Sequence, residues 1–272
     1  MLFTFTSSFI SPNSIPLQAG SDDGSLILIG GGSIPPKALE IFIQKIGGLD
    51  QPIIIIPTSA APVEINLKRE KNNWLNKGFT NVKVLHTNDP KIANTEKFVK
   101  PLKKAKGIWF GGGRQWRCID AYKNTLAEKE FHNLLNRGGV IIGNSAGASV
   151  QGSFLARGAQ ASNIPIIAPE KEHQVGFGFL KNMSVDQHAD TRNRWMQMQE
   201  IILKHPEILG ISIAEHTAVL IQKNCLEVFG EGEVAIHHID LTNGRSKKEL
   251  PYKMISCGQV FNLQSKRIEN CD

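Results

Sequence analysis

The chain has 272 residues, of which 41% are hydrophobic and 21% charged, close to the average for soluble globular proteins. This composition excludes a disordered, collagen-like or coiled-coil protein. The net charge of +6 is spread along the chain rather than gathered in one arm, and no run approaches the ~20 apolar residues of a membrane helix, so we expect neither nucleic-acid nor membrane binding.

Residues 1–24 are predicted to be a flexible N-terminal lead-in. Apolar side chains near the start, among them Leu2, Phe3 and Phe5, are typical of an export signal, but no Lys or Arg precedes them and Ser and Thr interrupt them. We therefore expect a cytoplasmic protein and keep export through a weak N-terminal signal as the alternative. Residues 25–272 are predicted to form a single α/β catalytic domain.

From Ser25 onward, short apolar runs alternate with amphipathic segments, which is typical of a parallel sheet covered by helices on both faces. Continuous apolar runs bounded by Gly or Pro indicate strands buried on both sides. In chain order the pattern predicts strands at 26–29, 53–56, 82–85, 107–110 and 140–142, and helices at 36–46, 64–77, 96–104 and 126–137.

The composition changes after Ser145. Glycine and polar residues dominate 152–178, a stretch too long for a simple connection and therefore a candidate active-site loop. Beyond it the pattern predicts a strand at 183–185, a helix at 193–204 and β-rich segments at 209–213, 218–222, 226–229 and 234–239. The predicted fold is thus α/β, with a mostly parallel central sheet and a β-rich C-terminal part.

The sequence Gly143-Asn144-Ser145-Ala146-Gly147 directly follows a predicted buried strand. This G-x-S-x-G pattern is typical of a nucleophile elbow, in which small neighbours allow a tight strand-to-helix turn that exposes the serine hydroxyl. The pattern alone also occurs by chance in glycine-rich turns. Because a strand precedes it, we predict that Ser145 is a nucleophile and that the Ala146 N–H helps to hold an oxyanion.

A serine nucleophile needs a base, and among eight histidines His188 is the best placed. It follows the predicted strand 183–185, and residues at the carboxyl ends of neighbouring parallel strands converge on one crevice. His173 and the pair His237-His238 are the competing histidines. No C-x-x-C pair or other ligand cluster accompanies them, so we predict neither a metal site nor a cofactor.

Two further features end at the same predicted crevice. Gly111-Gly112-Gly113 follows the strand 107–110, so the N–H of Gly112 or Gly113 is a candidate second oxyanion donor; a plain tight turn explains the glycines equally well. Arg192 and Arg194 follow His188 closely, and guanidinium groups at that place suit the bidentate capture of a substrate carboxylate.

These segments together resemble the S51 family of serine peptidases, which includes cyanophycinases and the aspartyl dipeptidase E group. The resemblance extends from Ser25 to about Ile239. It rests on the glycine clusters 30–32 and 111–113, the serine motif 143–148, the segment 176–180 and Asp186-Gln187-His188 with the two arginines. Segments downstream, 205–211, 217–219 and 228–232, are similar to the cyanophycinase branch in particular.

The resemblance implies a flavodoxin-like three-layer fold, distantly shared with class I glutamine amidotransferases. It implies that Ser145 and His188 are catalytic, and that Gln115, Asp186, Gln187, Arg192 and Arg194 contact the substrate. The implied reaction is the hydrolysis of β-aspartyl (isopeptide) bonds by an exopeptidase that releases β-Asp-Arg or related dipeptides. We therefore expect a peptide or cyanophycin-like substrate as the partner and leave a homodimer open.

The chain also departs from the family pattern. The acidic residue that normally orients the histidine is expected between Ser145 and His188, where the best alignment places Asn163; Glu170 or Glu172 could supply the carboxylate instead. Asparagine cannot stabilise an imidazolium by charge. Arg114 stands where cyanophycinases usually have an acid. These departures support the alternative of a catalytically impaired S51 paralogue that binds a peptide or metabolite.

Overall fold

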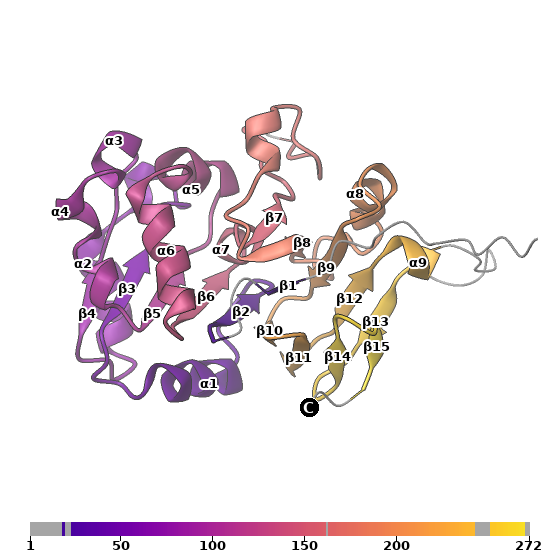
Figure 1. Ribbon diagram of the computed structural model, residues 1–272, viewed down its shortest axis with the longest axis horizontal. Coiled ribbons are helices and arrows are strands. Elements are labelled where there is room, and N and C mark those ends of the chain that lie inside the picture. The colour runs from indigo at the N-terminus through magenta and orange to yellow at the C-terminus, as the bar shows by residue number, and fades with distance from the viewer. Residues whose placement is uncertain (1–17, 20–22, 162, 243–250, 270–272) are drawn as a thin grey trace, which may run out of the picture.

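The computed structural model describes residues 18–19, 23–161, 163–242 and 251–269, which form two β-sheets and the helices around them (Figure 1). The larger sheet has nine strands in the order β15-β14-β11-β10-β2-β6-β5-β3-β4. Its parallel half comprises β4 (Val82–Val84), β3 (Ile53–Ile56), β5 (Gly107–Phe110), β6 (Val140–Asn144) and β2 (Ser25–Ile29). Its antiparallel half comprises β10 (Thr217–Gln222), β11 (Cys225–Gly230), β14 (Val260–Asn262) and β15 (Arg267–Ile268).

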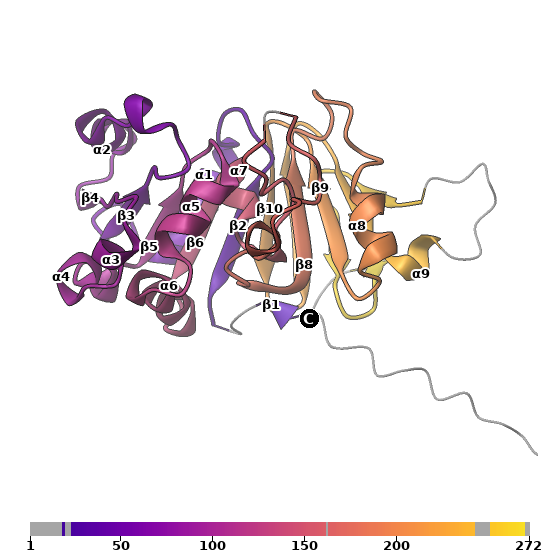
Figure 2. The same ribbon diagram turned by 90° about the horizontal axis from the view of Figure 1, so that it is seen from above.

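Helices cover both faces of the parallel half because its central strands are apolar on both sides. Leu28 and Ile29, which point to opposite faces of β2, are both fully buried. Helices α1 (Pro36–Ile46) and α2 (Leu67–Leu75) pack on one face, and α4 (Glu96–Val99), α5 (Gln115–Tyr122) and α6 (Leu126–Asn136) pack on the other. Figure 2 shows α2 on one side of the strands and α4 and α6 on the opposite side.

A second sheet packs against the antiparallel half. It has the strand order β1-β8-β9-β12-β13, with β7 also paired to β8. The strands β7 (Gly152–Phe154), β8 (Leu180–Gln187) and β9 (Leu209–Ile213) are parallel, whereas β1 (Gln18–Ala19), β12 (Val234–His237) and β13 (Lys253–Ile255) run antiparallel to their neighbours. Apolar residues of β8, β9, β10 and β11 share one core, and α8 (Met198–Lys204) covers the outer face.

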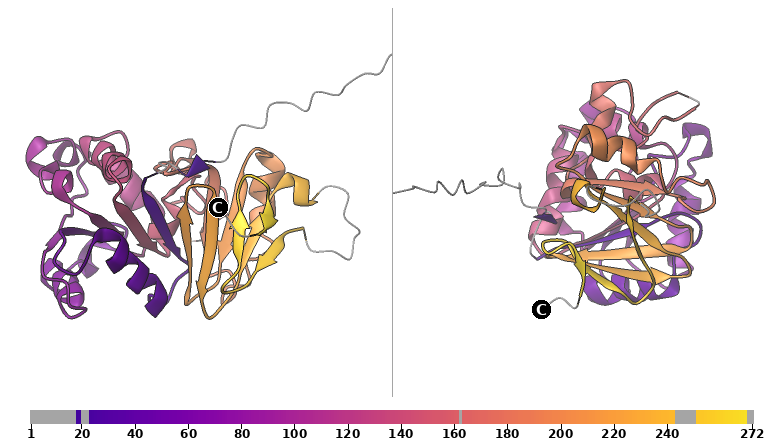
Figure 3. Two further views of the ribbon diagram at one scale, coloured as in Figure 1. Left: turned by 60° about the horizontal axis from the view of Figure 1, so that its bottom comes forward. Right: turned by 90° about the vertical axis from the view of Figure 1, so that its right-hand side faces the viewer.

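The expected α/β class and the β-rich C-terminal part are confirmed, and the strands of that part gather on one side of the molecule in Figure 3. The layering is more complex than one helix–sheet–helix sandwich, because one half of the large sheet packs against the second sheet. The expected strands at 53–56, 107–110 and 209–213 and the expected helix at 36–46 match the structure residue for residue.

Three predicted helices were too long. The predicted helix 64–77 is shortened to α2 because Asn66 caps it by accepting a hydrogen bond from the Arg69 N–H, and residues Pro62–Glu64 form a separate 3-10 turn. Pro101 divides the predicted helix 96–104 into α4 and a 3-10 turn, Leu102–Lys104. The predicted helix 193–204 begins only at Met198.

Sequence periodicity did not predict α5 or the strands β1, β7, β13, β14 and β15. It also did not predict the short helices α3 (Pro90–Ala93), α7 (Ala146–Ser149) and α9 (Ile239–Thr242), or the 3-10 turn Lys171–Gln174. Of the predicted lead-in, Gln18–Ala19 pairs with β8 and residues 23–24 are described, whereas 1–17 and 20–22 lie outside the described residues. Within the described ranges, no helix is both long and apolar enough to cross a membrane.

Candidate active site

Ser145 directly follows Asn144 at the carboxyl end of β6, which lies between β2 and β5 in the large sheet. It has φ 54° and ψ −116°, a conformation that non-glycine residues rarely adopt. The turn into α7 is tight: a Cβ on Gly143 would lie 2.0 Å from the Gly147 carbonyl oxygen, and one on Gly147 would lie 2.1 Å from the Phe110 carbonyl oxygen. These close approaches explain why the sequence has glycine two residues before and two residues after the serine.

His188 follows β8 and points its imidazole at this serine. The Ser145 Oγ and His188 Nε2 atoms are 2.8 Å apart, a hydrogen-bond distance. The two residues come from different sheets, not from neighbouring strands of one sheet as we expected. The junction with β2 brings them together, because the Ser145 N–H donates to the Ile29 carbonyl and the His188 N–H donates to the Gly30 carbonyl at 2.7 Å.

Glu215 is the residue that contacts the other imidazole nitrogen. Its carboxylate Oε1 is hydrogen-bonded to His188 Nδ1. Glu215 lies in the turn between β9 and β10, where its own N–H donates to the Asp190 carboxylate at 2.9 Å. The structure therefore corrects the prediction that Asn163 or Glu172 takes this place: both are exposed residues in the 152–178 segment, and neither is the partner of His188.

A signal for Glu215 was present in the sequence. It follows the predicted strand 209–213 by two residues, so the same strand-end rule that selected His188 also applies to it. It was missed because the family pattern led us to look for the acid between Ser145 and His188. Glu170, the third residue considered, is half-buried and likewise does not contact His188.

The surroundings of His188 keep its imidazole neutral. Burial is the largest influence and lowers its pKa below the ordinary 6.5; the nearby positive charges of Arg192 and Arg194 lower it further, while the Glu215 hydrogen bond opposes them. The pKa of Glu215 is itself lowered, chiefly by its hydrogen bond with His188. At neutral pH an ionised Glu215 therefore accepts the Nδ1–H, which leaves Nε2 free to accept the serine proton.

Gly112 lies against the serine on the other side. A Cβ on Gly112 would be 3.4 Å from Ser145 Cβ and 3.9 Å from Ser145 Oγ. The N–H groups of Gly112, Gly113 and Ala146 donate no hydrogen bond to any residue that the structure describes. Gly113 faces away from the serine, because a Cβ on it would meet the Ser59 carbonyl at 2.0 Å. Of the two glycines, Gly112 thus has the better position for an oxyanion donor.

The glycine cluster 30–32 forms a platform under the histidine. Gly31 has φ +133°, and a Cβ on it would lie 2.2 Å from His188 Cε1, so only glycine lets the ring pack there. The turn is held from three sides: the Asn144 amide donates to the Gly32 carbonyl, the His216 N–H donates to the Gly31 carbonyl, and Ser33 Oγ is 2.9 Å from His216 Nδ1. Residues flanking Ser145 and Glu215 therefore fix the surface on which His188 rests.

A buried ion pair lies two residues before the histidine. Arg157 Nε and Nη2 donate to the two carboxylate oxygens of Asp186 at 2.7 and 2.8 Å, and the side chains are only 3% and 0% exposed. Arg157 Nη2 also donates to Gln197 Oε1 at 2.5 Å. Asp186 was predicted to contact the substrate, but its placement is that of an anchor for Arg157. Arg157, inside the glycine-rich 152–178 stretch, was not predicted.

The other predicted substrate contacts differ in accessibility. Arg192 is exposed and Arg194 half-buried; burial is the largest influence that lowers the Arg194 pKa, to about 10. Gln187 is buried, and within the described chain its Oε1 atom has no hydrogen-bond partner. Gln115 is also buried, at the start of α5, and donates to the Ala156 carbonyl at 3.3 Å. The two arginines are therefore the more accessible of the four.

Two other histidines that competed for the role of base lie in separate hydrogen-bond networks. His237 is buried in β12, where its two ring nitrogens contact Gln199 and Ser212, and burial lowers its pKa to about 3. His173 bonds to Asp120 at 2.8 Å. Neither is the partner of Ser145, which supports His188 as the base.

Comparisons with known proteins found a matching family model and similar proteins. The model of peptidase family S51 matches residues 26–229. A cyanophycinase of Synechococcus elongatus is 27% identical, over 93% of this chain and 83% of its own, and one of Geminocystis herdmanii is 30% identical, over 78% and 79%.

Solved structures show the same fold. A peptidase from an acI-B1 actinobacterium has a TM-score of 0.67 and 25% identity, and the match covers 89% of this chain and 98% of that one. A putative peptidase E protein from Listeria monocytogenes has a TM-score of 0.55 and 19% identity over 77% of this chain and 99% of that one, a level at which the likeness concerns the fold alone.

Proposed function

Because this chain belongs to peptidase family S51 and is a serine peptidase, we propose that it acts on peptides that contain β-aspartyl (isopeptide) links, with Ser145 as nucleophile, and releases β-Asp-Arg or related dipeptides by breaking the bond that joins the terminal unit to the rest of the peptide. The observation that carries the catalytic part is the continuous chain of hydrogen bonds from Ser145 Oγ through the His188 ring to the Glu215 carboxylate. The substrate class is supported by the cyanophycinases among its relatives.

In the first half of the proposed reaction, Ser145 Oγ attacks the carbonyl carbon of the scissile bond while its proton passes to His188 Nε2. Negative charge develops on the carbonyl oxygen, where the unused N–H groups of Gly112 and Ala146 can hold it. The C–N bond then breaks, and the leaving amine takes the proton from Nε2. The product is an ester between the substrate's acyl group and Ser145.

In the second half, His188 takes a proton from water, and the resulting hydroxide attacks the ester carbonyl. The ester bond breaks, Ser145 Oγ regains its proton from Nε2, and the acid product leaves. Glu215 stays ionised throughout and stabilises the imidazolium that forms twice in each cycle. Its lowered pKa, caused chiefly by the hydrogen bond with His188, suits this role.

Substrate orientation is proposed to come from the two arginines. Arg192 and Arg194 follow the histidine closely in the chain, and the positive charge of each lowers its pKa, which supports this proposal. When a β-Asp-Arg unit is joined to the chain through its aspartyl residue, the α-carboxylate of its arginine stays free, whereas a residue within an ordinary α-peptide has no free α-carboxylate. Capture of this carboxylate by guanidinium groups would favour β-linked units.

The alternative of an impaired binding protein rested on Asn163 and Arg114. The contact between Glu215 and His188 removes the first reason, because the site has a carboxylate at the place where Asn163 was expected. The Arg114 side chain donates to the Ala161 carbonyl at 3.2 Å, which provides a structural role for it. We therefore favour the active enzyme.

The experiment compares cleavage of β-Asp-Arg oligomers and of α-linked aspartyl peptides, with products identified by mass spectrometry. We expect the wild type to cleave only the β-linked substrates and the Ser145→Ala variant to lose roughly 10⁶-fold in turnover. Ser149→Ala is the matched control: Ser149 lies in α7, the short helix that begins directly after Ser145, and its hydroxyl has no hydrogen-bond partner within the described chain. Undiminished cleavage by Ser145→Ala, or none by the wild type, contradicts the proposal.

A further inference from the structure

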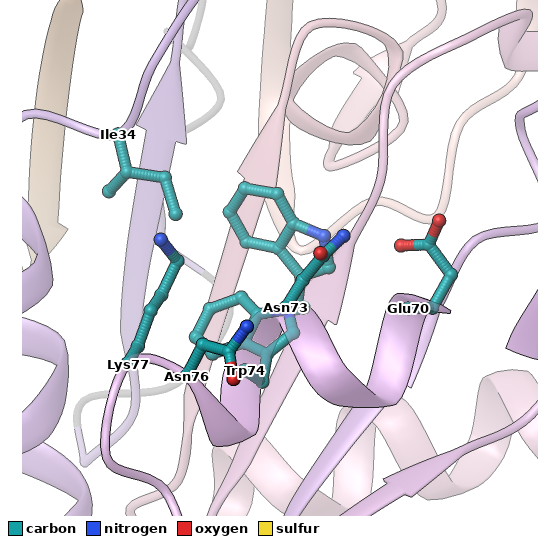
Figure 4. Close-up of a pocket in the computed structure, with 7 residues that line it drawn as sticks. Ile34, Glu70, Asn73, Trp74, Asn76 and Lys77 are labelled. Atoms are coloured by element: carbon teal, nitrogen blue, oxygen red, sulfur yellow. The ribbon is translucent and has the colours of Figure 1, made fainter. Parts of the chain in front are cut away.

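A cavity of about 410 Å³ lies beside the catalytic turns, on the face of the large sheet that α1 and α2 cover. Two indole rings line it: Trp74 of α2 and Trp109 of β5, whose centroids are 5.1 Å apart with a T-shaped arrangement. Ile34, the next residue after Ser33 of the glycine platform, lines it from above in Figure 4. The cavity thus has an aromatic and aliphatic surface.

Its polar lining comes from one side of α2 and the turn after it. Glu70 and Asn73 lie on the same face of the helix as Trp74, and Lys77 follows one turn later (Figure 4). Asn73 and Lys77 are exposed and Glu70 is half-buried, so these side chains form the solvent-facing rim of the cavity. The side chains of Asn73 and Lys77 make no hydrogen bond or ion pair with any residue that the structure describes, and Glu70 has only Arg69 at 3.6 Å.

The charges are separated in a way that suits a zwitterion. Glu70 and Lys77 lie at opposite ends of the cavity lining in Figure 4. A cationic group near Glu70 would also face the indole rings, which attract cations. A carboxylate would be drawn to Lys77 at the other end. A purely apolar ligand would leave both charges unpaired.

The cavity is close enough to the nucleophile to hold part of the same substrate. Trp109 precedes Gly112 by three residues, which span at most ~11 Å of extended chain, and Gly112 lies against Ser145. A peptide cleaved at Ser145 therefore needs to extend only a few residues to reach the indoles. We propose that this cavity binds a zwitterionic segment of the peptide substrate, remote from the scissile bond.

This inference rests on the proposed function for the identity of the peptide, so its test measures binding separately from cleavage. In the Ser145→Ala variant, β-Asp-Arg oligomers of two and six units are titrated while tryptophan fluorescence is recorded. Two of the four tryptophans line the cavity, so occupation should change the signal. We expect the six-unit oligomer to bind at least about fivefold more tightly than the two-unit one.

Charge reversal at the cavity tests whether the cavity causes the tighter binding of the six-unit oligomer. In the Ser145→Ala background, Lys77→Glu and Glu70→Lys should each abolish the advantage of the longer oligomer and leave binding of the two-unit oligomer within twofold. Lys71→Glu is the matched control, because Lys71 lies on α2 beside a different hollow, next to β4. Equal binding of both oligomers, or an advantage that survives both reversals, overturns the inference.

Cleavage of the two-unit oligomer by the wild type separates the two proposals. If the wild type cleaves it but length brings no gain in binding, the peptidase proposal stands and the cavity proposal fails. If length-dependent binding is seen and is lost in Lys77→Glu while the wild type cleaves nothing, the cavity proposal stands and the assigned reaction is wrong.

Discussion

Two acid–base pairs lie at the end of β8, and they differ in the exposed fraction of their side chains. The Arg157–Asp186 pair is sealed, with side chains 3% and 0% exposed, whereas the side chains of His188 and Glu215 are 11% and 25% exposed. The first pair has two charge-assisted hydrogen bonds in a fixed bidentate geometry. The second includes a residue whose protonation can change near neutral pH.

The contrast concerns two residues at the end of β8: Asp186, which belongs to a buried ion pair, and His188, which contacts Ser145. Asp186 holds the glycine-rich 152–178 stretch to the second sheet through Arg157, while His188, two residues later, leaves the strand with φ 54° and turns to Ser145. The His188 N–H donates to the Gly30 carbonyl, and its ring contacts Ser145 on one side and Glu215 on the other. Each of the following changes tests one side of this comparison.

The largest effect of these changes is expected from Glu215→Gln, which keeps the shape of the more exposed His188–Glu215 pair and removes the negative charge of Glu215. In serine-protease triads the corresponding change costs ~10⁴ in turnover, and we expect a similar loss here. Because Glu215 raises the pKa of His188, the acid limb of the pH–rate profile should also move to lower pH. Steady-state kinetics across pH measures both effects.

Glu172→Gln is the matched control for that variant, because Glu172 is an exposed acid that the sequence pattern offered for the same role. It should retain wild-type turnover and the wild-type pH profile. A loss of turnover in Glu172→Gln equal to that in Glu215→Gln would mean that the His188–Glu215 pair is not the one whose protonation controls catalysis.

Asp186→Asn should affect stability more than chemistry, because it leaves the Arg157 charge buried and unpaired. Breaking a buried pair from one side costs about 3–5 kcal/mol, and we expect that loss in the free energy of unfolding by denaturant titration. Replacing both partners, as in Arg157→Met with Asp186→Leu, should recover part of it. If Asp186→Asn unfolds like the wild type, the sealed pair does not anchor the 152–178 stretch.

On the pH dependence of Ser145 reactivity toward a substrate-independent probe, Arg192→Gln should have the smallest effect of these changes, and one opposite in direction to Glu215→Gln. The Arg192 charge lowers the pKa of His188, so its removal raises that pKa and moves the acid limb of Ser145 reactivity to higher pH. Added salt should weaken the difference between variant and wild type, because Arg192 is exposed. Lys171→Gln removes the same charge from an exposed side chain in a separate turn, and it should leave the acid limb of the pH profile unchanged.

Much of the fold could be predicted from the sequence because its strands are continuous apolar runs bounded by glycine or proline. The pattern located Ile53–Ile56 and Gly107–Phe110 correctly to the residue. It could not indicate that β8 belongs to a second sheet, because a buried strand has the same composition in either sheet. Short segments such as α7, with four residues, contain too little periodicity to be recognised.

The site was predicted to the extent that its residues follow strands directly. Ser145 and His188 each follow a strand and are hydrogen-bonded, although their strands belong to different sheets. Glu215 also follows a strand, but the contacts between two turns that bring it to His188 cannot be read from the spacing along the chain. Arg157 was missed for a similar reason, because its partner Asp186 is 29 residues away in another element.

The most direct test of the account is whether Ser145 reacts as an activated nucleophile without any assumption about the substrate. The folded protein is incubated with a fluorophosphonate probe, and the labelled residue and its rate are determined by mass spectrometry. We predict modification of Ser145 alone, at a rate that falls as His188 becomes protonated below its lowered pKa and that drops sharply in Glu215→Gln but not in Glu172→Gln. No labelling of Ser145, or labelling at the same rate in Glu215→Gln, would contradict the proposed Ser145–His188–Glu215 site.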